Sequence, residues 1–157
     1  MNAGPALALL EQSRQCLTQA YAAELAAVRL VTSQDAAMRA AAALVAGRGT
    51  RGPQDLWPLL AAQSPELAEW AEVFALAAVR RQQLETLCPG LVSGLVSGDR
   101  DGCHRGAHHR CGVRVPVREA DDLLRAAETF VDLVALTLGM PRGERAVRRL
   151  AAVRESA

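Results

Sequence analysis

The chain has 157 residues and a formal net charge of +1 at pH 7, so it has the size of one domain and no strong overall attraction for nucleic acid or an anionic membrane. Half of the residues are hydrophobic but only 3% are aromatic, and a core of Ala, Leu and Val suits close helix packing better than β-sheet packing. We find no basic leader and no stretch of roughly 20 apolar residues, so we expect a cytoplasmic protein without a membrane segment, whose four cysteines stay reduced.

A stripe of apolar residues at intervals of three, four or seven positions predicts the first helix. The stripe consists of Leu7, Leu10, Leu17, Tyr21, Leu25 and Val28. Pro5 fits the first turn of this helix, and the polar run at 33–35 offers a break after it. A second, Ala-rich helix then follows and ends before Gly47. Its predicted buried face contains Met38, Ala41, Ala42 and Val45.

Two further helices are predicted in the middle of the chain. Residues 47–53 form a loop by their Gly and Pro content, and a short helix around Trp57 follows them. Ser64 is a favourable N-cap and Pro65 a favourable first residue for a longer helix, which continues to about Leu87. The predicted buried stripe of the longer helix is Leu67, Trp70, Phe74 and Ala77.

An irregular insertion separates this helix from the last one. Residues 90–114 contain a glycine-containing repeat, LVSGLVSG, and a stretch rich in Cys, His and Arg. Pro116 begins the last long helix, and Gly139 ends it. The inward face of that helix is predicted to be Leu123, Ala127, Phe130, Val134 and Leu138. The whole pattern predicts an all-α protein, an antiparallel bundle of four to five helices over residues 5–139, with a basic C-terminal tail over residues 140–157.

The insertion holds all three histidines of the chain, clustered with two cysteines within nine residues. Thiolate and imidazole groups are ligands that zinc prefers. The candidate ligands are Cys103, His108 and Cys111, with Cys88 or His109 as the fourth. Because their spacing matches no familiar zinc-finger pattern, we expect a solvated polar loop without a cofactor and keep zinc binding as an alternative.

The remaining polar and aromatic candidates are better explained as structural residues. Asp121 and Asp122 are adjacent on a helix and point about 100° apart, so both cannot face one substrate. We expect them to belong to a solvated helix face near the N-terminus of the helix. Trp57 and Trp70 could stack on bases, but we expect them to fill an Ala-rich core. Arginines in the second half of the insertion could contact phosphate, although no aromatic residue lies between them. These arginines are Arg105, Arg110 and Arg114.

Three segments of the chain resemble a family of small actinobacterial HEPN-domain proteins. They are DAAMRAAAALVA at residues 35–46, DLWPLLAAQSPELAEWAEVFALAAVRR at 55–81 and READDLLRAAETFVDLV at 118–134. The resemblance covers roughly residues 5–139. It implies a bundle of four or five antiparallel helices that is often dimeric, so a second copy of the chain is one expected partner.

The resemblance also raises the question of ribonuclease activity, because active members of the wider superfamily have an Arg, four to six intervening residues and then a His. No position at that spacing before His104, His108 or His109 is an Arg, so no catalytic residue is predicted. We therefore expect a non-catalytic HEPN-like binding module whose partner is a protein, a nucleotide or RNA. Two alternatives remain open. One is a ribonuclease with non-standard residues, such as Arg105 or Arg110 with the loop histidines. The other is a metal-responsive interaction module built on the Cys/His loop.

Overall fold

The computed structural model describes residues 3–48, 55–87 and 114–140. These ranges form five α-helices and one 3-10 helix and contain no strand, which confirms the all-α prediction. In chain order the elements are α1 (Ala3–Ala22), α2 (Ala26–Gly47), α3 (Leu56–Gln63), the 3-10 helix η1 (Pro65–Leu67), α4 (Ala68–Leu87) and α7 (Val117–Thr137). None of the described helices is long and apolar enough to cross a membrane.

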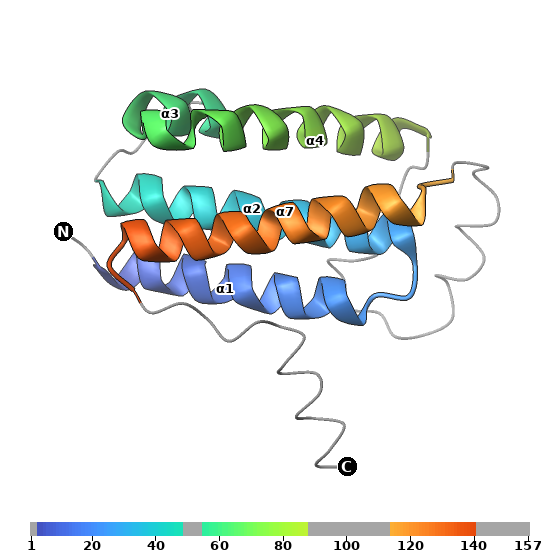
Figure 1. The fold of residues 1–157 in the computed structure, drawn as a ribbon, viewed down its shortest axis with the longest axis horizontal. Helices are drawn as coiled ribbons and strands as arrows, with labels where there is room; N and C mark the ends of the chain where they lie inside the picture. The colour runs from blue at the N-terminus through green and yellow to red at the C-terminus, as the bar shows by residue number, and fades with distance from the viewer. Residues whose placement is uncertain (1–2, 49–54, 88–113, 141–157) are drawn as a thin grey trace, which may run out of the picture.

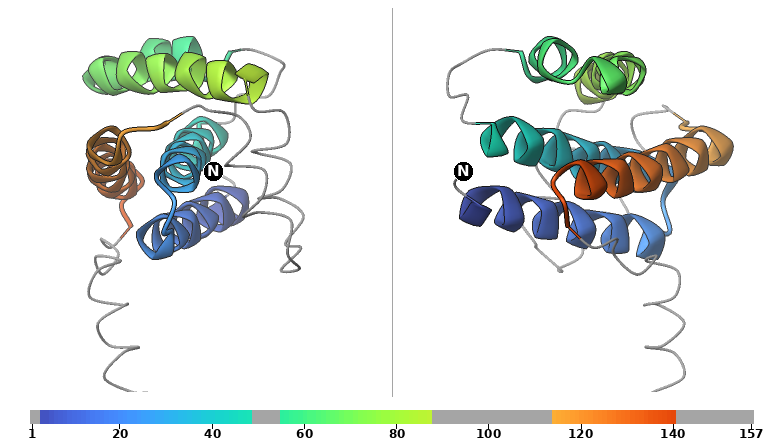
Figure 2. Two further views of the ribbon diagram at one scale, coloured as in Figure 1. Left: turned by 90° about the vertical axis from the view of Figure 1, so that its right-hand side faces the viewer. Right: turned by 60° about the vertical axis from the view of Figure 1, so that its left-hand side comes forward.

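The helices form three layers (Figure 1, Figure 2). α1 lies on one face, α2 and α7 lie side by side in the middle, and α3 with α4 covers the opposite face. α1 and α4 run in one direction and α2 and α7 in the other, so each outer layer is antiparallel to the middle one. α2 contacts α1, α3, α4 and α7, which makes it the central helix of the bundle.

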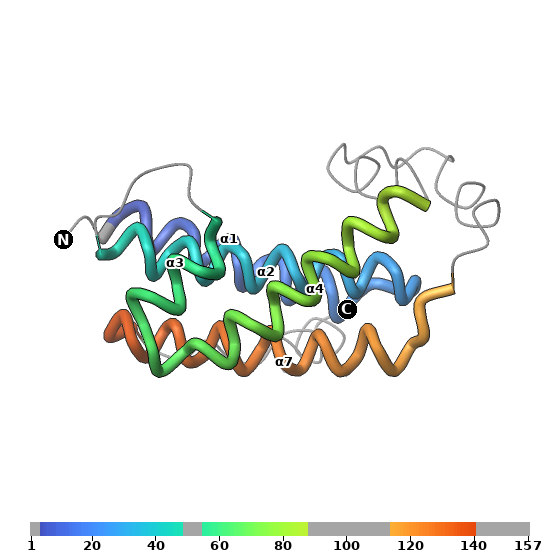
Figure 3. Tube along the Cα trace, turned by 90° about the horizontal axis from the view of Figure 1, so that it is seen from above, coloured from blue at the N-terminus to red at the C-terminus, as the bar shows by residue number. Residues whose placement is uncertain are grey.

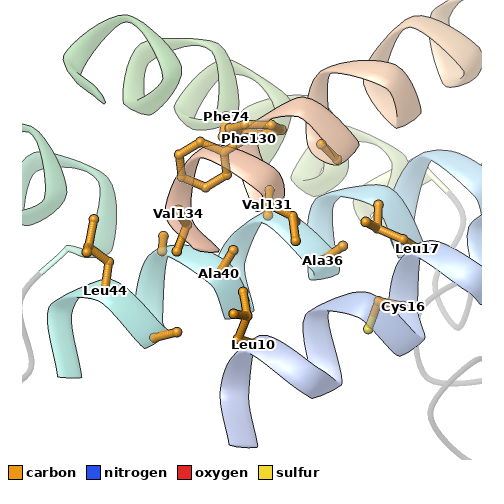
Figure 4. Close-up of a cluster of buried hydrophobic side chains, with 14 of the residues drawn as sticks. Leu10, Cys16, Leu17, Ala36, Ala40, Leu44, Phe74, Phe130, Val131 and Val134 are labelled. Carbon is orange, nitrogen blue, oxygen red and sulfur yellow. The ribbon is translucent and has the colours of Figure 1, made fainter. Parts of the chain in front are cut away.

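The central position of α2 depends on its small side chains. Five of its alanines are fully buried: Ala36, Ala37, Ala40, Ala41 and Ala43. Alanine also favours the helical conformation, because it loses no side-chain entropy there. Figure 4 shows Ala40 of α2 between Leu10 of α1 and Val134 of α7. A core of small aliphatic side chains therefore joins the first helix to the last.

The break between the first two helices lies earlier in the chain than the sequence predicts. α1 stops at Ala22 and α2 begins at Ala26, so the predicted break at 33–35 is wrong. Leu25 adopts an extended backbone conformation, with φ −89° and ψ 127°, just before α2. Two members of the predicted apolar stripe, Leu7 and Leu25, are exposed rather than buried.

Ser33 and Asp35 remain helical because the folded protein satisfies their polar groups, whereas the buried Oε1 of Gln34 has no partner among the described residues. Ser33 is fully buried, and its hydroxyl donates a 2.7 Å hydrogen bond to the carbonyl of Arg29, one turn earlier. Asp35 forms an ion pair with Arg81 of α4. Ser and Asp weaken an isolated helix by competing for its backbone hydrogen bonds. The hydrogen bond of Ser33 within α2 and the ion pair of Asp35 with α4 remove that reason for a break at these two residues.

The predicted ends of α7 are confirmed. Pro116 immediately precedes the first residue of the helix, and Gly139 follows its last turn. Gly139 has a φ of +69°, the left-handed conformation that favours glycine at the end of a helix. The N–H of Met140 then donates a 2.8 Å hydrogen bond to the carbonyl of Ala135, which satisfies a terminal carbonyl group.

The predicted cap of the longer middle helix is only partly confirmed. Pro65 is the first residue of η1, which leads directly into α4. Ser64 precedes it, but its buried hydroxyl makes no capping hydrogen bond and has no partner among the described residues. Ser64 instead links α3 to η1 through its backbone. Its N–H donates to the carbonyl of Leu60 and its carbonyl accepts from the N–H of Leu67, both at 2.8 Å.

Four aromatic rings meet where α3 and α4 cover α7. Phe74 of α4 and Phe130 of α7 are fully buried, with ring centroids 5.1 Å apart. Trp57 of α3 is buried beside them. Trp70 lies 6.0 Å from Phe130, as its place in the predicted stripe indicates, but it is only partly buried. These rings fix the position of α4 over α7.

Candidate interaction groove between α4 and α7

Most of the site residues predicted from the sequence lie outside the described residues. They are the candidate zinc ligands and two of the three candidate phosphate-binding arginines: Cys88, Cys103, His108, His109, Cys111, Arg105 and Arg110. The third arginine, Arg114, is exposed shortly before α7. Within the described ranges, no group of three or more His, Cys, Asp or Glu side chains is placed to hold a metal ion.

Asp121 and Asp122 have different surroundings, as their adjacent positions on a helix predict. The side chain of Asp122 is 61% exposed, which agrees with a solvated helix face. Asp121 departs from that expectation, because it pairs with Arg29 of α2. Trp57 stacks on Phe74 with ring centroids 5.5 Å apart and is buried. It is therefore a core residue and not a platform for bases.

A groove of about 460 Å³ runs between α4 and α7. α4 provides one wall and α7 the other, with one side chain of α2 between them. The apolar lining residues are Leu30, Val73, Leu76, Ala77, Leu123 and Ala126. Only Ala77 and Leu123 of this set belong to the apolar stripes predicted from the sequence, so the stripes did not reveal the groove.

Three charged residues complete the lining of the groove: Arg80, Glu119 and Asp122. Arg80 is bound to Glu119 twice, with Nε 2.8 Å from Oε1 and Nη2 3.4 Å from Oε2. Two-point contact of this kind is the strong form of an arginine–carboxylate pair. The described lining therefore has two carboxylates and one guanidinium that already has a carboxylate partner.

The apolar surface continues from the groove onto the outer face of α4. Val73, Leu76 and Val79 are 44%, 72% and 52% exposed, and their spacing of three residues places them along one side of the helix. Figure 3 looks down on α4, which crosses above α2 and α7, and no described helix covers α4 from that side. We refer to Val73, Leu76 and Val79 as the α4 ridge. Contiguous exposed apolar surface of this kind marks interaction sites.

Ion pairs hold the groove walls in place. Arg81 of α4 binds Asp35 of α2 and Glu85 of its own helix. Burial lowers the pKa of Arg81, but the hydrogen bonds and charges of the two carboxylates outweigh burial and raise the pKa above its usual value. Arg29 of α2 forms an ion pair with Asp121 of α7. Both groove-forming helices are thus tied to α2.

Two other features are weaker candidates for a functional site than the groove. Cys16 is buried, and burial raises the pKa of its thiol, which keeps the sulfur protonated and unreactive. A hollow of about 680 Å³ lies along residues 79–87 at the end of α4, but the described residues that line it all come from this one helix. The groove between α4 and α7, whose lining comes from three helices, is therefore a better candidate site than either of these two features.

The sequence of the chain matches a family model. The model of the SAV_6107-like HEPN family matches residues 20–99. No curated protein and no solved structure matches the chain significantly. The matched range includes all of α2, α3 and α4, and with them the α4 ridge. It confirms the HEPN resemblance of the segments at 35–46 and 55–81, and it ends before the segment at 118–134.

Proposed function

The chain belongs to the SAV_6107-like HEPN family, and we propose that it acts as a non-catalytic binding module whose partner is a protein. The observation that carries this proposal is the continuous apolar surface formed by the groove and the α4 ridge. Leu76 lies in both and is 72% exposed. A protein partner would remove this surface from water, which contributes about 25 cal/mol for each Å² of apolar area buried.

The charges at the groove favour a protein over a nucleotide or RNA. Phosphate groups bind where arginine or lysine residues leave an excess of positive charge, whereas Glu119 offsets the charge of Arg80. Asp122 lies 3.9 Å from Arg118 and 3.8 Å from Arg125, so it adds no excess of positive charge to the groove. Bases bind by stacking on aromatic side chains, and the described lining of the groove includes no aromatic ring.

The same lining residues support a non-catalytic role. Glu119 is occupied by Arg80, and Asp122 faces solvent. Acid–base catalysis requires a group whose surroundings adjust its proton affinity, usually through burial beside another charge. The described lining includes no His, Cys or Ser that could act as a base or a nucleophile. This agrees with the missing Arg–His spacing of the superfamily ribonucleases.

The proposal is tested by purifying the tagged chain from its native host and identifying what remains bound. A protein partner should survive treatment with ribonuclease. It should be lost in Leu76→Glu, which places a charge on the α4 ridge, and retained in Leu7→Glu, which places the same charge on the exposed surface of α1. Material that disappears with ribonuclease, or that Leu76→Glu leaves fully bound, would contradict the proposal.

A further inference from the structure

Two exposed carboxylates lie beside the α4 ridge without a cation. Glu69 and Glu72 of α4 are both exposed. Each lies four residues before a member of the ridge, which is about one helical turn, so the carboxylates flank Val73 and Leu76. Neither glutamate forms an ion pair with another described residue. An apolar strip with negative charge beside it fits an occupant that is both amphipathic and basic.

The segment that follows α7 has this complementary composition. Residues 141–157, the part of the basic tail outside the described residues, contain five arginines and two glutamates. Their large aliphatic side chains follow one another at intervals of three: Val147, Leu150 and Val153. The α4 ridge has the same pattern, V-x-x-L-x-x-V, at residues 73–79. On a helix the aliphatic side chains of the tail would share one side, with Arg145 and Arg148 on the other.

We propose that residues 141–157 bind along the α4 ridge of the same chain as an amphipathic helix. In that arrangement the tail runs parallel to α4, and its three aliphatic side chains lie level with the three residues of the ridge. Arg145 then lies between Glu69 and Glu72 along the helix axis. The inference rests on the proposed function for the location of the binding surface. It adds the regulation of that surface, because a protein partner has to displace the tail.

The direction of the chain favours this contact. α4 and α7 run in opposite directions (Figure 1), and the rings of Trp70 and Phe130 lie 6.0 Å apart, so α7 ends beside the beginning of α4. Gly139 has a left-handed conformation, which turns the chain at the end of α7, and Pro141 and Gly143 favour a further turn. A chain that reverses there runs parallel to α4. The first arginines of the tail consequently meet the acidic beginning of α4.

The tail is also long enough to reach the ridge. Val73 precedes Phe74, whose ring contacts Phe130, so Val73 is close to the level of Phe130 along the bundle. The chain from Phe130 to Met140 extends about 15 Å beyond that level, at about 1.5 Å per helical residue. The segment from Met140 to Val147 spans up to about 23 Å when it is extended. The linking residues therefore allow the chain to turn back and place Val147 level with Val73.

Attachment to the same chain favours the tail over a separate helix of similar sequence. A short flexible link gives an effective concentration on the order of 1 mM, so a contact with a dissociation constant below about 1 mM keeps the ridge occupied most of the time. A separate protein has to compete with this contact for the same apolar surface. The tail therefore lowers the affinity of the ridge for a partner without closing it permanently.

A photo-reactive amino acid at position 76 of the purified full-length chain tests the contact. After irradiation, mass spectrometry should find position 76 linked to residues 147–153 in a product of monomeric mass. The yield should stay constant over a dilution series, because the contact is within one molecule. Position 7 on the exposed surface of α1 should give no such link. A link to residues 88–113, a yield that falls on dilution as a second copy would require, or no link at all would overturn the inference.

Two substitutions in the tail test which of its sides faces the ridge. Leu150→Glu should lower the yield of the link at least about tenfold, because it sets a carboxylate against apolar surface. Ala152→Glu is the matched control, because the same charge then lies on the opposite side of the tail helix, and its yield should stay close to that of the wild type. Equal losses in the two variants would contradict the proposed arrangement.

The same variants separate this inference from the proposed function. Leu150→Glu should increase the amount of host protein that the chain retains through Leu76, and Ala152→Glu should not. Retention that Leu150→Glu leaves unchanged would overturn the regulatory role of the tail. A host protein that depends on Leu76, found together with no link from position 76 to the tail, would overturn the inference alone. A link to the tail in a chain that retains no host protein would uphold the contact and contradict the proposed function.

Discussion

The ring of Phe74 on α4 lies 5.1 Å from the ring of Phe130 on α7, with an angle of 49° between the ring planes. Both side chains are fully buried. Aromatic pairs prefer such tilted contacts at separations of about 4.5–7 Å. This contact lies within the core between the two helices that form the groove walls, so it sets the distance between the walls and couples the stability of the fold to the shape of the candidate site.

Phe130→Ala should lower the free energy of unfolding by about 3–5 kcal/mol, because it leaves a cavity in the centre of the aromatic cluster. Trp70→Ala should lower it by less, about 2 kcal/mol, because Trp70 is only partly buried and loses less contact. Chemical denaturation followed by circular dichroism measures both values. A loss for Trp70→Ala that equals or exceeds the loss for Phe130→Ala would contradict the observed burial.

Cys16 should contribute to the pH dependence of the free energy of unfolding. Burial raises the pKa of its thiol in the folded chain, so the unfolded chain ionises first as the pH rises. The stabilisation is fully present below the unfolded pKa of about 8.5 and is lost as the pH rises towards the folded value. The wild type should therefore lose stability above this pH more steeply than Cys16→Ala. Denaturation midpoints that fall in parallel for the two proteins would contradict this.

The sequence predicts the helical architecture and the ends of α7 well, because Pro116 and Gly139 are strong local signals. It misplaces the break between α1 and α2, because the partner of Asp35 is Arg81, on another helix. Tertiary partners of this kind leave no periodic trace in the sequence. Conversely, the turn before Leu25 contains neither Gly nor Pro to mark it.

The apolar periodicity of the sequence does not reveal the α4 ridge either. The stripe through Leu67 and Phe74 correctly identifies the buried face of α4. α4 is apolar on both faces, however, so periodicity alone does not reveal that Leu76 and Val79 point outward. The available signal was the presence of large apolar residues outside the buried stripe. The Arg80–Glu119 pair joins residues 39 apart in the sequence and becomes visible only in the fold.

The purified chain should not cleave RNA. The basis for this expectation is that no His follows an Arg at the spacing of the superfamily ribonucleases. A labelled single-stranded RNA incubated with the wild type and with a variant that changes His104, His108 and His109 to alanine provides the measurement. Cleavage by the wild type that the triple variant lacks would instead support the ribonuclease alternative.

Zinc should leave the stability of the chain unchanged. The candidate ligands lie outside the described residues, so the expectation rests on their unfamiliar spacing. Thermal unfolding with and without added Zn²⁺ tests it, because an ion that binds only the folded chain raises the melting temperature. A rise that disappears when Cys103 and Cys111 are both changed to serine would establish a metal site.

Cross-linking from the centre of the α4 ridge tests the central claim most directly. A photo-reactive amino acid is placed at position 76 of the full chain in its native host, with position 7 on α1 as the control, and mass spectrometry identifies the adducts after irradiation. Binding through the ridge predicts a protein adduct at position 76 that position 7 does not give. An RNA adduct at position 76, or the same weak background at both positions, would contradict the assignment of this surface as a protein-binding site.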